Sequence, residues 1–197
     1  MEETKRRKLE IPKKKVTQQE LDTMMGVLFK KWEETPGMSP ELTPVLGSFA
    51  DMDFTGLSFM NLHLDGATFA RCIFDGCDLR YASLKNTHMK DCSFLGAACQ
   101  QTQFCGTYLF RSVLEDADIR GAKFTGATLT GVKFIDCDVS EDTDFTNSNT
   151  EDALFIGTPS PMKGIDEIVT DTVADASRKL IEEIFSISDN QTPGGSK

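Results

Sequence analysis

The chain has 197 residues, a formal net charge of −10 and hydrophobic residues at 39% of its positions. That length suits one domain with appendages, and no apolar run approaches the ~18 residues that a membrane-spanning helix needs. Because no apolar segment follows the basic N-terminus, no secretory signal peptide is expected. We expect a soluble cytoplasmic protein, with a nuclear location as the alternative if the source is eukaryotic, viral or an injected effector.

The first predicted segment is a disordered basic arm over residues 1–16. Seven of the first fifteen residues are basic and three are glutamates, a local balance of +4. Three roles are open for the arm: a solubilising tail, phosphate contacts with nucleic acid or another anionic surface, and a nuclear address. The basic residues are Lys5, Arg6, Arg7, Lys8, Lys13, Lys14 and Lys15.

An amphipathic helix over residues 17–34 is predicted next. Thr17 and Glu20 form a capping-box pattern, which marks the start of a helix. The apolar residues that follow are spaced by three and four: Leu21, Met24, Met25, Leu28, Phe29 and Trp32. Prolines at 36, 40 and 44 then predict an extended connector over residues 35–46.

A five-residue period dominates the chain from Phe49 to Val139. Every fifth residue is apolar, at all nineteen positions, and a smaller residue mostly stands two positions earlier. Glycine recurs two positions after the large residue, as a tight corner requires. A period of five fits neither a helix nor an ordinary strand, so the pattern predicts a repeat architecture. The series restarts one residue late at Phe145, which predicts one inserted residue near Glu141 to Thr143.

A second helix is predicted within residues 158–187, after Pro159 and Pro161. Two roles are open for both terminal helices: capping the ends of the repeat, or binding a partner or a second copy. Residues 188–197 contain Pro193-Gly194-Gly195 and are predicted to form a disordered tail. The apolar stripe of the second helix consists of Ile165, Ile168, Val169, Val173, Leu180, Ile181, Ile184 and Phe185.

The repeat units resemble those of the pentapeptide-repeat family, whose consensus is a small residue, Asp or Asn, Leu or Phe, and two polar residues. Ala117-Asp118-Ile119-Arg120-Gly121 and Cys77-Asp78-Leu79-Arg80-Tyr81 carry the resemblance, which covers roughly half of the chain. It implies an all-β solenoid over residues 47–157: a right-handed quadrilateral β-helix of about five coils, with four pentapeptides per coil. Phenylalanines twenty residues apart would stack at a spacing of about 4.8 Å.

Catalysis finds no support in the sequence. Four of the six cysteines occupy small inward positions, Cys99 occupies a large one, and Cys105 alone points outward, so we interpret them as core residues. Cys72 and Cys92 lie one coil apart, but a disulfide is not expected in a reducing cytosol. His63 and His88 fall on different faces, and no metal-ligand spacing or phosphate-binding loop occurs. We expect a non-enzyme with no catalytic, cofactor or metal site.

Six apolar residues are predicted to point outward from the rod. Clusters of exposed apolar groups are usually shielded from water. Either a terminal helix folds back over them, or they form a surface for a partner or for self-association. In the second case the two aromatic residues would be the anchors. The six are Ile73, Leu95, Tyr108, Phe110, Val113 and Ile135.

The family resemblance implies a different use of the acidic residues. Some bacterial members form acidic dimeric rods that imitate duplex DNA in the DNA site of type II topoisomerases. The candidate mimic surface here is Asp116, Asp118, Asp136 and Asp138. This chain departs from that pattern because its acids are spread over several faces, a basic arm precedes the rod and the C-terminal helix is long.

The leading hypothesis is therefore a non-catalytic protein-interaction scaffold that presents a rigid rod to a protein partner. The alternatives are a DNA-mimicking inhibitor or protector of a DNA-binding enzyme, and nucleic-acid binding through the basic arm. A homodimer, formed through the C-terminal helix or the exposed apolar face, is a further alternative.

Overall fold

A computed structural model describes residues 14–33, 47–158 and 163–165, with side chains for all of these except residues 27–33. The predicted connector, most of the predicted C-terminal helix and basic residues Lys5 to Lys13 lie outside the described residues. The elements in chain order are β1 (Lys14–Lys15), α1 (Gln18–Glu33), β2 (Ser48–Ala50), β3 (Met52–Asp53), β4 (Thr68–Ala70), β5 (His88–Lys90), β6 (Val113–Glu115), β7 (Lys133–Ile135) and β8 (Leu154–Ile156).

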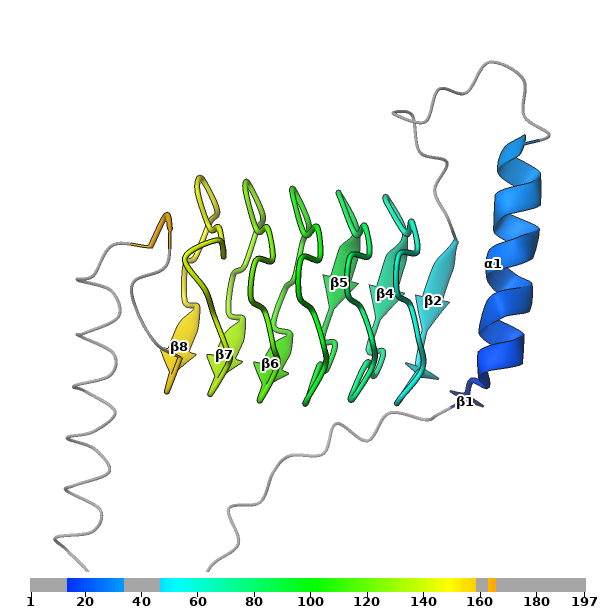
Figure 1. The fold of residues 1–197 in the computed structure, drawn as a ribbon, viewed down its shortest axis with the longest axis horizontal. Coiled ribbons are helices and arrows are strands. Elements are labelled where there is room, and N and C mark those ends of the chain that lie inside the picture. Colours follow the sequence, from blue (N-terminus) through cyan, green and yellow to red (C-terminus); the bar gives the residue numbers. More distant parts are fainter. Residues whose placement is uncertain (1–13, 34–46, 159–162, 166–197) are drawn as a thin grey trace, which may run out of the picture.

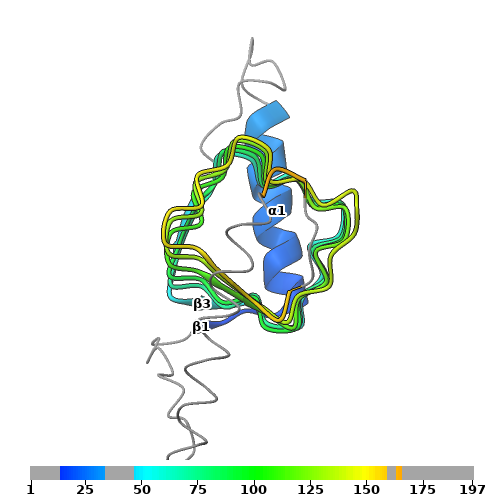
Figure 2. The ribbon, with the colours of Figure 1, turned by 90° about the vertical axis from the view of Figure 1, so that its left-hand side faces the viewer.

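The repeat forms a right-handed, four-sided β-solenoid of about five turns. Figure 1 shows its coils side by side from β2 to β8, and Figure 2 shows the four-sided outline along the axis. All contacts between coils are parallel, and residues twenty apart pair, as Phe49 does with Phe69. At about 4.8 Å per coil, the rod is about 25 Å long.

Four columns of paired residues define the faces of the rod. Face 1 contains β2, β4 and β5 and continues through Tyr108, Thr128 and Asn149. Face 2 contains β3, Ile73, Ser93, β6, β7 and β8. Face 3 contains Ser58, Asp78, Ala98, Asp118 and Asp138. Face 4 contains His63, Ser83, Gln103, Lys123, Asp144 and Lys163.

Large side chains fill the interior as stacked ladders. Phe104, Phe124 and Phe145 are fully buried, and the Phe124 ring centroid lies 4.8 Å from that of Phe104 and 4.7 Å from that of Phe145. Small inward residues satisfy backbone groups within this core. The hydroxyl groups of Thr102 and Thr107 donate to carbonyls in the coil below, at 2.7 and 2.6 Å. These two buried hydroxyl groups are thus paired instead of being left to destabilise the core.

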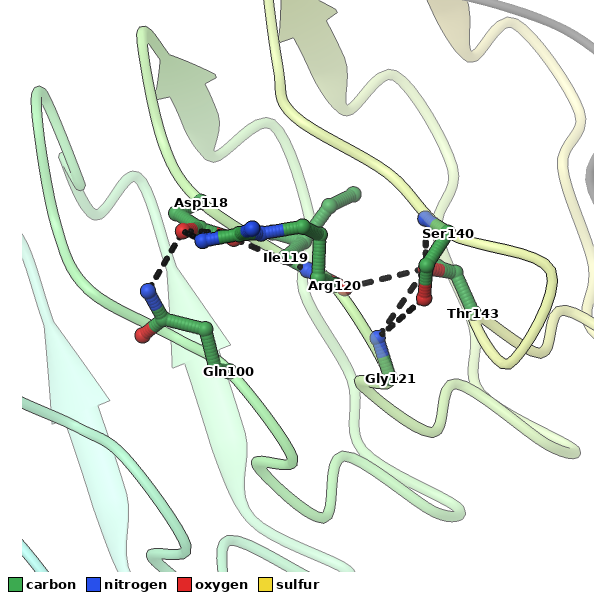
Figure 3. Close-up of polar contacts among 7 residues, drawn as sticks. All are labelled: Gln100, Asp118, Ile119, Arg120, Gly121, Ser140 and Thr143. Atoms are coloured by element: carbon green, nitrogen blue, oxygen red, sulfur yellow. Dashed lines mark hydrogen bonds and ion pairs between the residues drawn. The ribbon is translucent and has the colours of Figure 1, made fainter.

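The predicted inserted residue lies between faces 3 and 4. Asp118 pairs with Asp138 at a spacing of twenty residues, but Lys123 pairs with Asp144 at twenty-one. Thr143 restores the inward register there: its hydroxyl accepts from the Ser140 amide at 3.0 Å and donates to the Ile119 carbonyl at 3.1 Å (Figure 3). The remaining columns then continue with an offset of one residue.

The N-terminal segment covers the β2 end of the rod (Figure 1). β1 pairs in parallel with β3, and Leu21 of α1 is 1% exposed within the core cluster. The Gln18 side chain accepts from the Ser58 amide at 2.8 Å and donates to the Ser58 carbonyl at 3.1 Å, as a neighbouring strand would. The sequence pattern predicted disorder through residue 16, whereas Lys14 and Lys15 are strand. The difference arises because the edge of the first coil offers unpaired backbone groups to any strand that reaches it.

The last described contact of the rod joins Lys163 to the final coil. Its ammonium lies 2.9 Å from a carboxylate oxygen of Asp144, whose residue is 8% exposed. Gly164 follows with a φ of +86°, and a Cβ there would collide with the backbone of Phe145 and Thr146. Close backbone approach and positive φ therefore both require glycine at this point.

Asp144 makes the rod sensitive to acid. Hydrogen bonds from Thr146, together with Lys163, lower the pKa of its carboxyl from 3.8 to about 2. A carboxyl with a lowered folded-state pKa contributes stability that is complete above its unfolded pKa and is lost as pH falls through the folded value. We expect the free energy of unfolding of the wild type to fall between about pH 4 and about pH 2 more steeply than that of Asp144→Asn. Urea titrations across this range measure the two slopes, and equal slopes would contradict the assignment.

Candidate interaction surface

The most exposed large apolar groups on face 1 are Tyr108 and Phe110, here called the aromatic pair. Tyr108 is 49% exposed and Phe110 is 39% exposed. The Tyr108 ring stacks on the His88 ring one coil below, with centroids 4.8 Å apart and planes at 8°. The Arg111 guanidinium lies 4.9 Å from the centre of the Phe110 ring. Both rings are thus held in place on a rigid backbone, which lowers the entropy that binding would cost.

The other four predicted surface residues form a staggered row on face 2, here called the apolar row. On this face each coil has two outward residues, one on either side of an inward residue. The four apolar residues occupy the first and the second of these positions in alternate coils, so that each lies diagonally from the next. All four are half-buried. The row comprises Ile73, Leu95, Val113 and Ile135.

Two further residues extend the apolar row in the last coil. Ile156 pairs directly with Ile135, and Leu154 pairs with Lys133 in the same strand pair. Both are half-buried. The sequence pattern did not identify Leu154 and Ile156 as outward residues of this face, because the inserted residue shifts both by one position. The restart of the five-residue period at Phe145 was the signal that could have found them.

A ladder of alternating charges runs along the corner between faces 1 and 2. Arg71 forms two hydrogen bonds with Asp51, at 2.7 and 2.6 Å, and Arg111 forms two with Asp91, at 2.9 and 3.0 Å. The hydrogen bonds from Arg71 lower the pKa of the Asp51 carboxyl. All four residues have φ between 53° and 57°, a conformation that costs L-residues about 1–2 kcal/mol each. The ladder separates the aromatic pair from the apolar row.

The four predicted mimic residues form a block of two stacked pairs. Asp136 lies one coil above Asp116 at a corner, and Asp138 pairs with Asp118 on face 3. Asp118 is bonded to Arg120, with an ion-pair distance of 2.6 Å, and to the Gln100 amide (Figure 3). Among the residues that the structure describes, it is the one member of the block in an ion pair. The block spans two coils. Of its four negative charges, that of Asp118 is already neutralised by Arg120.

The described basic residues of the arm are exposed, and the cysteines are mostly buried, as their interpretation as core residues predicts. Lys14 and Lys15 are exposed, and the Lys14 ammonium lies 3.9 Å from Glu20. Burial raises the pKa of the Cys72 thiol to about 11 and that of Cys77 to about 12. All six cysteines are free, and Cys105 alone is not fully buried. Thiols with such pKa values are poor nucleophiles.

Neither a metal cluster nor a membrane span occurs in the described part of the chain. Within residues 14–33, 47–158 and 163–165, no three or more His, Cys, Asp or Glu residues gather as metal ligands would. Over the same residues, no helix has the length and apolar character needed to cross a bilayer.

The family model described as pentapeptide repeats matches residues 72–109 and 107–149, in eight copies. Among curated proteins, no sequence matches the chain. A trypsin-treated variant of QnrB1, a plasmid-mediated fluoroquinolone resistance protein, is 19% identical, with coverage of 66% of this chain and 68% of that one and a TM-score of 0.43.

Two cyanobacterial structures are also similar. Rfr23, a pentapeptide repeat protein from Cyanothece 51142, is 21% identical, with coverage of 66% of this chain and 71% of that one and a TM-score of 0.35. HetL, a pentapeptide repeat protein involved in heterocyst differentiation regulation in Nostoc, is 15% identical, with coverage of 56% and 60% and a TM-score of 0.31. At these identities and scores, the likeness does not indicate what this chain binds.

Proposed function

We propose that this chain, a pentapeptide-repeat protein, is a non-catalytic scaffold that binds a protein partner through the aromatic pair on face 1. The single observation that carries the proposal is the exposure of Tyr108 and Phe110, at 49% and 39%, on a face whose backbone is fixed by its neighbours in the rod. Exposed aromatic side chains are typical anchors of protein interfaces. The half-buried apolar row on face 2 would extend the contact around the corner.

The electrostatic surroundings support a protein partner over a mimic of nucleic acid. The charge ladder beside the aromatic pair presents bases and acids in alternation, with each Arg bound to an Asp. Such a surface has little net charge, whereas a DNA mimic needs a continuous acidic surface. Asp116, Asp118, Asp136 and Asp138 are the candidate block for that role within the described residues, and Arg120 already neutralises part of it.

Affinity capture from a lysate of the native host, with and without nuclease treatment, tests the proposal. We expect the wild-type rod to retain a protein partner and Tyr108→Ala with Phe110→Ala to lose it, because truncating two interface anchors removes about 2 kcal/mol or more each. The matched control is Met60→Ala with Tyr81→Ala, which removes two comparably exposed apolar side chains at 39% and 57% from another part of the rod.

The outcomes of the capture experiment separate the candidate functions. Equal capture by the aromatic variant and the control would contradict the proposal. Material that disappears on nuclease treatment would favour nucleic-acid binding through the basic arm instead. Circular dichroism of each variant establishes that the rod is folded.

A further inference from the structure

The described chain ends beside the face that carries the aromatic pair. Successive segments occupy faces 1, 2, 3 and 4 in that order and then return to face 1. Lys163 is the last pairing residue, on face 4, and Ile165 packs against the core cluster. Ile165, the last described residue, therefore lies next to the point where the order of the faces would return to face 1. Tyr108 lies on that face two coils below Asn149 of the last coil.

The sequence that follows Ile165 is both apolar and acidic. Residues 166–187 contain six acidic and two basic residues. As a helix, these 22 residues would be about 33 Å long, which exceeds the rod length of about 25 Å. The segment is therefore long enough to reach the aromatic pair from the last coil. Its apolar stripe from Ile168 onward consists of Ile168, Val169, Val173, Leu180, Ile181, Ile184 and Phe185.

The border of the aromatic pair complements such a segment. Lys90 is exposed on face 1, one coil below Phe110 at the equivalent outward position. The Arg111 side chain is 57% exposed even while it is bonded to Asp91. An acidic segment with an apolar stripe would place its stripe on the two rings and its carboxylates near these two bases.

We propose that residues 166–187 of the same chain dock along face 1 and cover the aromatic pair, so that a partner must displace them to bind. This inference rests on the proposed function and adds a regulatory step to it. A covered site has an apparent affinity reduced by the fraction of molecules that are uncovered. The segment would act as an internal competitor for the anchors.

A cysteine reporter in the full-length protein tests the docking without any partner. Thr130 is half-exposed on face 1, one coil above Phe110 at the equivalent position. Thr130→Cys supplies a thiol on the proposed path, and its rate of maleimide labelling is measured. Native Cys105, half-buried on face 4, is the internal reference. The five other thiols are buried.

We expect Leu180→Asp with Ile184→Asp to speed labelling of the reporter by about fivefold or more, because a charged stripe undocks and frees the site. Thr172→Asp with Ser186→Asp adds the same charge outside the stripe, and we expect it to keep the slow rate. Labelling of Cys105 should not change in either variant.

Three results would overturn the docking. Equal reporter rates in all variants would show that nothing covers face 1. A protection that is lost on dilution would assign the cover to a second copy. Reduced partner capture by the Leu180→Asp, Ile184→Asp variant would make the segment part of the binding element, whereas we expect increased capture. Because the labelling experiment needs no partner, it tests the docking even if the proposed partner binding is wrong.

Discussion

Replacement of Phe124 by alanine is expected to lower the free energy of unfolding by about 3–5 kcal/mol, near the top of the range for core truncations. Phe124 is 0% exposed, is stacked between Phe104 and Phe145 and meets the edge of Phe134 with centroids 5.6 Å apart. The backbone of its coil is bonded to the coils on both sides. Because those bonds hold the walls apart, the cavity collapses little and its full cost is retained.

Urea unfolding of the variant measures this loss. Thr125→Ala is the matched control, because it truncates the next residue, which points outward and is half-buried. We expect the control to change stability by less than about 0.5 kcal/mol. A loss below about 1 kcal/mol for Phe124→Ala would mean that the stacked ring is not a principal element of the core.

Thr143→Val is expected to cost about 2–4 kcal/mol, although the two side chains have nearly the same shape. The Thr143 hydroxyl bonds the Ser140 amide and the Ile119 carbonyl, and the Gly121 amide points to it at 3.3 Å (Figure 3). With valine, these backbone groups would stay buried with fewer hydrogen-bond partners. The coil that contains the extra residue would also lose the hydrogen bonds that hold its ends together. Thr143 is 0% exposed, so water cannot replace the hydroxyl.

Thr143→Ser separates the hydroxyl from the methyl group. Serine keeps the hydrogen bonds, so we expect it to retain most of the stability that valine loses. Chemical denaturation of the three proteins provides the comparison. Equal losses for serine and valine would indicate that packing of the methyl group, and not the hydrogen bonds, holds the inserted residue in place.

The five-residue period was sufficient to predict a repeat architecture because it constrains every inward position. The inward phenylalanines and the one-residue insertion near Thr143 follow from spacing, whereas the four-sided solenoid was implied by the family resemblance. The pairing of β1 with β3 could not be predicted, since two exposed lysines have no local signal for a strand. What determines that pairing is the open edge of the first coil, which is a property of the fold.

The outward residues were predicted less completely for a related reason. Repeat spacing places Tyr108 and Phe110 on one face, but it does not predict which side chains of the adjacent coils contact them. The alternation of Asp51, Arg71 and their equivalents at one corner was visible in sequence only by comparing residues twenty apart. The binding surface of a solenoid is free to vary while its core is fixed, so the partner cannot be derived from the period.

The affinity of the captured partner for three forms of the rod is the measurement that tests the scaffold most directly. The forms are the wild type, Tyr108→Ala with Phe110→Ala, and an acid-neutralised rod with Asp116→Asn, Asp136→Asn and Asp138→Asn, in which Asp118 keeps its bond to Arg120. We predict that the aromatic variant loses about a hundredfold or more in affinity, that the acid-neutralised rod binds like the wild type, and that added salt changes affinity little. A partner that tolerates loss of both rings, and binds more weakly when the acids are neutralised or salt is raised, would contradict the account.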